Sequence, residues 1–181
     1  MKTRNDLAEY FAEQNFNVGA EIGVASGNYS SILCQANPNL KLYCIDLWGP
    51  GSSRNEARYT REFAQAKAAL ADFNAEMIQK PSVEAAKDFE PGSLDFVYID
   101  AAHTFDNVMR DIIEWGGKVR RGGIVAGHDY CNSKNNGVKD AVLMWAKWHN
   151  LEVNVLPIPD KYWTPRDPGD EIPGLSWWIR K

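Results

Sequence analysis

Hydrophobic positions along the chain gather in short apolar runs, the pattern of buried parallel strands. Five runs precede residue 131: NVGAEIGV (17–24), LKLYCIDLW (40–48), AEMIQK (75–80), SLDFVYID (93–100) and GGIVAGHDY (122–130). Two more lie near the end, LEVNVLP (151–157) and LSWWIRK (175–181). The loop between these two is rich in proline, with Pro157, Pro159, Pro165, Pro168 and Pro173. Each run predicts a strand.

The segments between the runs predict helices. GNYSSILCQA (27–36) can form one, and residues 54–73 are rich in Ala, Glu, Lys and Arg, which are strong helix formers. An amphipathic stripe with helical spacing is formed by Phe105, Val108, Met109, Ile112 and Ile113. Thr104 is expected to cap the start of this helix, and Gly116-Gly117 to end it. Residues 137–150 predict a last helix, with Val138, Ala141, Val142 and Trp145 on one face.

Strands and helices that alternate at this spacing predict an α/β fold with an open, mainly parallel sheet and helices on both of its faces. The seven runs predict seven strands, with an antiparallel strand at the C-terminus. We expect one domain over residues 1–181, with an N-terminal helix at 1–16, a cofactor-binding core at 17–130, and a C-terminal helix and strand pair at 131–181. Sheets of this type bind ligands beyond the carboxyl ends of their strands.

Composition narrows the class of protein. The 181 residues are 44% hydrophobic and 24% charged, which is ordinary globular usage, and the net charge of −4 disfavours binding to nucleic acid. No apolar run is long enough to span a bilayer, and the N-terminus is too polar for a signal peptide. Cys34 and Cys44 lie in apolar surroundings and predict core positions rather than a disulfide framework or a zinc site. We therefore expect a cytoplasmic protein that binds neither nucleic acid nor membrane.

The end of the first predicted strand carries the first candidate site. Glu21, Gly23 and Gly27 have the spacing E-x-G-x-x-x-G, which is neither the dinucleotide fingerprint nor a P-loop. Glu21 would repel a pyrophosphate but suits a cationic ligand. Asp46 ends the second strand, where a carboxylate can accept hydrogen bonds from ribose hydroxyls. The four residues favour S-adenosylmethionine, and a plain tight turn at the glycines is the alternative.

Four segments together resemble one family: EIGVASG, YCIDLWG, LDFVYIDAAHTFDNVMRDI and VRRGGIVAGHDY. Over residues 18–142 they are similar to class I S-adenosylmethionine-dependent methyltransferases with a Rossmann-like fold, closest to small-molecule O-methyltransferases of the metal-dependent macrolide-sugar and catechol types. The resemblance implies that Glu21, Gly23 and Gly27 line the methionine moiety and that Asp46 holds the ribose. It also implies that Ser82 contacts the adenine and that Asp100 borders the cofactor. Trp48 is expected to pack beside the nucleoside. The alternative is a tryptophan that only shields its loop from solvent.

A cluster of catalytic and metal-binding side chains is expected where two neighbouring strands end. Asp100, His128 and Asp129 would suit Mg²⁺ or Mn²⁺, with Asp100 and Asp129 the stronger ligands and His128 the third. The resemblance implies that His103 is the general base, with His128 also at the catalytic centre. The alternatives are that Asp100 caps a helix, that His103 binds backbone, and that His128 bonds substrate or structure.

We therefore predict methyl transfer to a hydroxyl of a small molecule. A nicotinamide-dependent oxidoreductase would explain the sheet and Asp46 but not Glu21, and a non-catalytic cofactor-binding module is the third alternative. Residues 49–59 and 160–174 are expected to border the acceptor pocket, where Trp163 would stack on a ring. The first loop and the following helix carry three arginines, Arg54, Arg58 and Arg61. They would attract an anionic acceptor, or an exposed helix of mixed charge would account for them equally well. Little chain remains for a lid, so a homodimer that completes the site is a further expectation.

Overall fold

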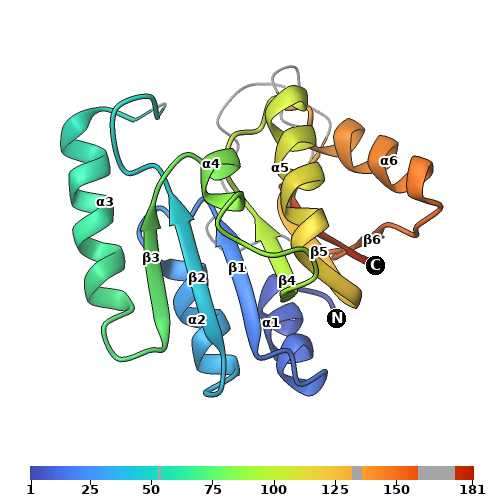
Figure 1. Ribbon diagram of the computed structural model, residues 1–181, viewed down its shortest axis with the longest axis horizontal. Coiled ribbons are helices and arrows are strands. Elements are labelled where there is room, and N and C mark those ends of the chain that lie inside the picture. The colour runs from blue at the N-terminus through green and yellow to red at the C-terminus, as the bar shows by residue number, and fades with distance from the viewer. Residues whose placement is uncertain (53, 132–135, 159–173) are drawn as a thin grey trace.

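The computed structural model describes residues 1–52, 54–131, 136–158 and 174–181, and shows a sheet with helices on both faces (Figure 1). The strands are β1 Val18–Ile22, β2 Lys41–Asp46, β3 Ala75–Gln79, β4 Leu94–Ile99, β5 Val119–Tyr130, β6 Asn154–Val155 and β7 Leu175–Arg180. The helices are α1 Arg4–Glu13, α2 Asn28–Ala36, α3 Glu56–Ala69, α4 Ser82–Ala86, α5 Phe105–Lys118 and α6 Val138–His149.

The seven strands form one sheet in the order β3-β2-β1-β4-β5-β7-β6. The strands from β3 to β5 are parallel, and β7 runs antiparallel to both β5 and β6. The predicted sheet, mainly parallel with an antiparallel C-terminal strand, is confirmed. Its strand order reverses between β1 and β4, so the ends of these two strands form the crevice in which such sheets bind ligands. The antiparallel β7 between β5 and β6 also distinguishes this sheet from the usual dinucleotide-binding sheet.

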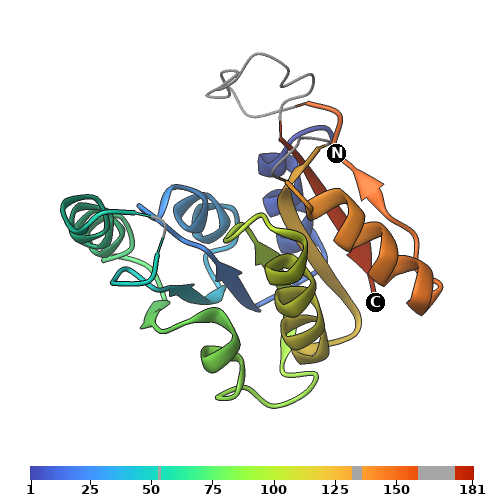
Figure 2. The ribbon, with the colours of Figure 1, turned by 90° about the horizontal axis from the view of Figure 1, so that it is seen from above.

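Each face of the sheet has its own hydrophobic core. One core joins α1, α2 and α3 to the sheet through residues that include Phe11, Leu33 and Phe96. The other joins α4, α5 and α6 to the opposite face around Trp115 and Trp177. Figure 2 shows these two groups of helices on either side of the strands. Because successive strand residues point to opposite faces, β4 supplies Phe96 and Tyr98 to the first core and Val97 and Ile99 to the second.

For α5, the predicted N-cap position of Thr104 is confirmed and the predicted end at Gly116-Gly117 is wrong. Thr104 occupies the N-cap position, but its side chain makes no capping hydrogen bond. The helix also continues through Gly116 and Gly117 to Lys118, and the chain passes directly into β5. Gly116 serves helix packing instead, because a Cβ there would lie 3.2 Å from the Trp145 ring of α6. The glycine therefore lets two helices approach each other closely.

The C-terminal region differs from its predicted bounds. The run at 151–157 forms only the two-residue strand β6, whereas β5 begins at Val119, three residues before the predicted run. Most of the proline-rich loop lies outside the described residues, including Pro159, Pro165, Pro168, Pro173 and Trp163. Cys34 and Cys44 are buried, as predicted. Among the described residues, no helix is both long enough and apolar enough to cross a membrane.

Candidate active site

The carboxyl end of β1 is pressed against the carboxyl end of β4. Gly23 has φ +93°, and a Cβ at this position would lie 2.1 Å from the carbonyl oxygen of Asp100. Hydrogen bonds fix both strand ends, since Gly23 N–H donates to Ile45 O at 2.8 Å and Asp100 N–H donates to Ile22 O at 2.7 Å. Gly27 follows with φ +79° as the N-cap of α2. Both glycines are thus required by backbone geometry, and they leave the strand ends open to a ligand.

Glu21 lies beneath this turn, 2% exposed, on the sheet face covered by α2. The Ser30 hydroxyl donates a hydrogen bond to its carboxylate. Burial raises the pKa of Glu21 to about 8, despite the opposing effect of the Ser30 hydrogen bond. The side chain is therefore mostly neutral at pH 7 in the free protein, and a cation placed nearby would favour its ionised form.

Asp46, at the end of β2, joins two parts of the site. Its carboxylate accepts hydrogen bonds from Ala25 N–H at 2.8 Å and from Trp48 N–H at 3.2 Å. The Arg54 guanidinium lies 3.4 Å from the same carboxylate. Asp46 thus fixes the glycine turn after β1 relative to the loop after β2. Its predicted contact with a ribose stays a prediction.

Trp48 supports this loop from inside the protein. Its indole N–H donates to Ala25 O at 2.8 Å, its ring packs edge-on against Phe63, and the residue is 2% exposed. Gln79, at the end of β3, donates a hydrogen bond to the Trp48 carbonyl at 2.9 Å. The Trp48 side chain therefore has a packing role, and its contact with a nucleoside stays a prediction.

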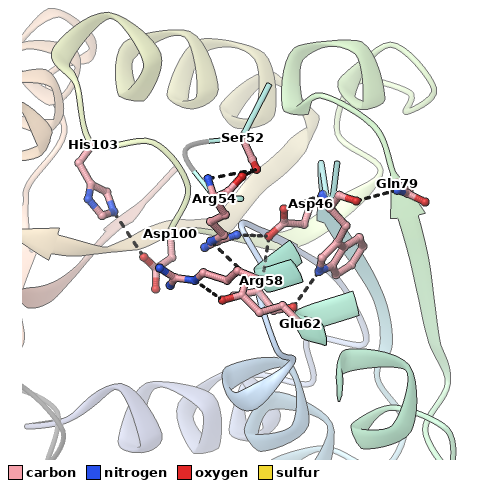
Figure 3. Close-up of polar contacts among 10 residues, drawn as sticks. Asp46, Ser52, Arg54, Arg58, Glu62, Gln79, Asp100 and His103 are labelled. Atoms are coloured by element: carbon pink, nitrogen blue, oxygen red, sulfur yellow. Dashed lines mark hydrogen bonds and ion pairs between the residues drawn. The ribbon is translucent and has the colours of Figure 1, made fainter. Parts of the chain in front are cut away.

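A network of charges on α3 holds Arg54 in place. Arg54 Nε lies 3.2 Å from Glu62, and Arg58 Nε lies 2.9 Å from the same carboxylate. Figure 3 shows Arg54 between Asp46 and Glu62. Arg54 and Arg58 therefore form ion pairs with buried carboxylates. The two predicted alternatives were attraction of an anion and an exposed helix of mixed charge, and neither included a buried partner. Glu62 was missed because its spacing within a helix of mixed charge looks like that of any surface residue.

Ser82 is the first residue of α4 and takes part in a buried network. Its hydroxyl donates to Asp111 at 2.5 Å and accepts a hydrogen bond from the Trp115 indole at 2.8 Å. Burial raises the pKa of Asp111 to about 6, opposed by the Ser82 hydrogen bond. The hydroxyl thus joins α4 to α5, and the adenine contact of Ser82 stays a prediction.

Two carboxylates and an imidazole converge beyond β4 and β5. His103 Nε2 lies 3.0 Å from Asp129 and 3.8 Å from Asp100. One ligand atom from each of the three residues lies within 4.8 Å of the others, so together they could hold a metal ion. The structure groups His103, rather than the predicted His128, with the two carboxylates. Figure 3 shows the Asp100 carboxylate facing the His103 ring.

His128 contacts Asp129 from a more buried position than His103 does. Its Nδ1 lies 3.4 Å from the Asp129 carboxylate, and its side chain is 13% exposed, against 42% for His103. Asp129 itself has φ +55°, and its carbonyl accepts a hydrogen bond from the Asn136 amide at 3.1 Å. The two histidines therefore contact the carboxylate of Asp129, and Asn136 holds its backbone carbonyl.

Electrostatic coupling within this group is strong. Interactions of the His103 ring with the Asp100 and Asp129 carboxylates raise the pKa of His103 to about 10, so the free protein carries an imidazolium between two carboxylates. Burial alone would raise the pKa of Asp129, but its hydrogen bonds with His103 and His128 hold that pKa well below its usual range. Burial acts to lower the pKa of His128, yet Asp129 and Asp100 raise it.

Arg4 of α1 also reaches the site. Its guanidinium lies 3.9 Å from Asp100 and 4.8 Å from the centre of the Tyr29 ring. Tyr29, in the first turn of α2, donates a hydrogen bond to the Arg4 carbonyl at 2.9 Å. The sequence contains no signal for this placement, because Arg4 lies 96 positions before Asp100 in a segment that looks like an ordinary polar helix.

Comparison with known families decides the class of enzyme. Residues 20–130, more than half of the chain, match the model of a methyltransferase domain. The chain belongs to the class I S-adenosylmethionine-dependent methyltransferases. The match includes the ends of β1, β2, β4 and β5, where the predicted cofactor and catalytic residues lie. This methyltransferase therefore uses S-adenosylmethionine, and the nicotinamide alternative is wrong.

Solved structures share the fold at low sequence identity. A putative caffeoyl-CoA O-methyltransferase from Staphylococcus aureus is 20% identical, with a TM-score of 0.68 over 98% of this chain and 83% of its own. An O-methyltransferase from Bacillus cereus, solved in complex with SAH, is 13% identical, with a TM-score of 0.70 over 98% and 80%. A putative rRNA-methylase from Clostridium thermocellum is 13% identical, with a TM-score of 0.68 over 99% and 97%.

These neighbours carry names with different acceptors, and at such identities the likeness concerns the fold alone. No curated protein matches the methyltransferase in sequence. The acceptor must therefore be argued from the site.

Proposed function

We propose that this methyltransferase transfers the methyl group of S-adenosylmethionine to a hydroxyl of a small molecule, with a divalent cation and His103 at the acceptor. The observation that carries the proposal is the convergence of Asp100, His103 and Asp129 beside the Gly23 turn. The acidic net charge of −4 supports a small acceptor rather than RNA, which binds to concentrated basic surfaces.

The donor set fits a hard cation. Asp100 and Asp129 offer carboxylate oxygens, the ligands that Mg²⁺ and Mn²⁺ prefer, and each side chain is 25% exposed, which leaves room for water or an acceptor oxygen. The imidazolium of His103 already lies between the two carboxylates, so this position favours positive charge. Such a cation, when bound, would lower the pKa of an acceptor hydroxyl. His128 would orient Asp129, since it contacts that carboxylate from the more buried side.

His103 would accept the proton of the hydroxyl. A base must be neutral before it accepts a proton. A cation bound to Asp100 and Asp129 would weaken the interactions of these carboxylates with His103, and so lower the pKa of His103. The hydroxyl oxygen then attacks the methyl carbon in line with the sulfur, the carbon–sulfur bond breaks, and the sulfonium becomes the neutral thioether of S-adenosylhomocysteine. The proton remains on the His103 ring. Glu21 and Asp46 would align the donor through its methionine and ribose parts, which supplies the proximity that an in-line transfer needs.

Methyl transfer to a panel of small hydroxylated molecules tests the proposal. His103→Ala should reduce turnover by at least about 100-fold while S-adenosylhomocysteine still binds. His149→Ala is the matched control, because that imidazole contacts its own helix, through the Trp145 carbonyl at 2.8 Å and the Trp145 ring. Excess chelator should suppress turnover, and added Mg²⁺ should restore it. Full turnover of His103→Ala would contradict the role of His103 as the base. Full turnover in excess chelator would contradict the role of the cation.

A further inference from the structure

The outer surface of α6 carries an exposed apolar stripe. Its inner face is buried against α5 and the sheet. On the outer face, exposed fractions are 43% for Leu143, 48% for Met144 and 82% for Trp148. We define the α6 stripe by its helical spacing as Asp140, Leu143, Met144, Lys147 and Trp148. Large apolar side chains gathered on one exposed helical face mark an interaction surface.

The stripe borders a shallow groove of about 460 Å³. The groove is lined by the stripe and, near the start of α6, by Phe105 of α5. Trp148 lies at the opposite end of the helix, about two turns from Asp140. One surface thus carries both a projecting indole and an apolar hollow that could receive one.

The charges of the stripe show which partner fits. Asp140 and Lys147 lie seven residues apart on the same face, roughly 10 Å along the axis, with Leu143 and Met144 between them. A two-fold axis between Leu143 and Met144 would place a second α6 antiparallel to the first. Each Asp140 would then face the Lys147 of the other copy, because the two charges are equidistant from the axis. A surface that is complementary to itself in this way is what an isologous dimer requires.

We infer that the α6 stripe is the interface of a homodimer, with two antiparallel α6 helices, two Asp140–Lys147 ion pairs, and each Trp148 in the Phe105 end of the other copy's groove. This goes beyond methyl transfer and does not depend on it. One helical stripe per copy gives an interface at the small end of the usual range, so a dissociation constant in the micromolar range is expected. The start of α6 is also linked to the site, since Gly137 N–H, just before the helix, donates to His103 O at 2.8 Å.

Sedimentation velocity on the full chain tests this dimer through exchange of the two charges. Asp140→Lys and Lys147→Asp should each weaken association at least about tenfold, because like charges then meet twice across the axis. The double variant should restore association. A mixture of the two single variants should form a heterodimer, because the stripe of the Asp140→Lys chain then carries two lysines and that of the Lys147→Asp chain carries two aspartates.

Two further variants complete the test. Trp148→Ala should also yield monomer, whereas Lys67→Asp, a charge reversal on α3 across the sheet, should leave the dimer unchanged. Circular dichroism should show unchanged folding, since every substituted side chain in the stripe faces outward. A wild-type chain that is monomeric at about 100 μM would overturn the inference and leave the stripe to a different partner. Failure of the two single variants to associate when mixed would overturn the antiparallel geometry.

Discussion

Substitution of Gly23 by alanine should destabilise the fold as well as the cofactor site. The residue has φ +93°, and a Cβ would lie 2.1 Å from Asp100 O and 2.5 Å from Asp100 C. Neither strand end can retreat easily, because Gly23 N–H is bonded to Ile45 O and Asp100 N–H to Ile22 O. The new methyl group thus meets backbone rather than a flexible side chain.

The magnitude follows from two contributions. A positive φ in a residue with a side chain costs roughly 1–2 kcal/mol. Overlap with fixed neighbours adds roughly 1–3 kcal/mol. We therefore expect Gly23→Ala to lower the free energy of unfolding by about 2–5 kcal/mol and the melting temperature by about 5–20 °C for a chain of this length. Affinity for S-adenosylhomocysteine should fall as well, because the ends of β1 and β4 move apart.

Urea unfolding of three alanine variants measures the effect against matched controls. Gly27→Ala has a similar strain at φ +79°, but its Cβ would meet Ala66 Cα at 3.1 Å, so a loss of only about 1–2 kcal/mol is expected. Gly117→Ala, in α5 with nothing within 4 Å, should gain about 0.5–1 kcal/mol. A Gly23→Ala variant that is more stable than Gly27→Ala would refute the close approach of β1 and β4.

Three further predictions concern the charged residues. The raised pKa values of Glu21 and Asp111 favour the protonated side chains in the folded state. The free energy of unfolding should therefore fall as the pH rises, from about 4 to about 6 for Asp111 and from about 4 to about 8 for Glu21. In urea titrations Glu21→Gln and Asp111→Asn should flatten this decline, and a flat wild-type profile would contradict it. Asp46→Ala should weaken S-adenosylhomocysteine binding by about 10- to 100-fold in calorimetry, and unchanged affinity would remove its ribose role. Glu62→Gln should cost about 1–3 kcal/mol of stability, because two guanidinium groups lose their charged partner, whereas Arg58→Met, at a side chain 56% exposed, should cost less than about 1 kcal/mol.

Local patterns predicted the parts of this protein that depend on neighbouring residues in the chain. The sheet followed from seven apolar runs, and the meeting of Asp100 with Asp129 followed from the rule that neighbouring parallel strands present their carboxyl ends at one edge. Gly116 was misread because its role lies in a contact with Trp145 of another helix, which periodicity cannot reveal.

The rest of the site depends on long-range contacts. Arg4 reaches Asp100 only because α1 packs beside α2, and a polar leading segment gives no sign of that. His103 and His128 flank the same aspartate, and only the directions of the side chains show that His103 lies on the open side. Ser82 has the residue type expected of a ligand contact, but its hydroxyl belongs to a buried network with Asp111 and Trp115.

The proposed reaction depends on a cation site built from Asp100 and Asp129 beside the methyl donor. Binding of Mn²⁺ to the protein saturated with S-adenosylhomocysteine, followed by electron paramagnetic resonance, tests it most directly. We expect one bound ion per chain in the wild type, and loss of that ion in Asp129→Asn with S-adenosylhomocysteine still bound. A wild-type protein that binds S-adenosylhomocysteine but leaves all Mn²⁺ free would contradict the cation site, and one that binds neither would contradict the proposed reaction as a whole.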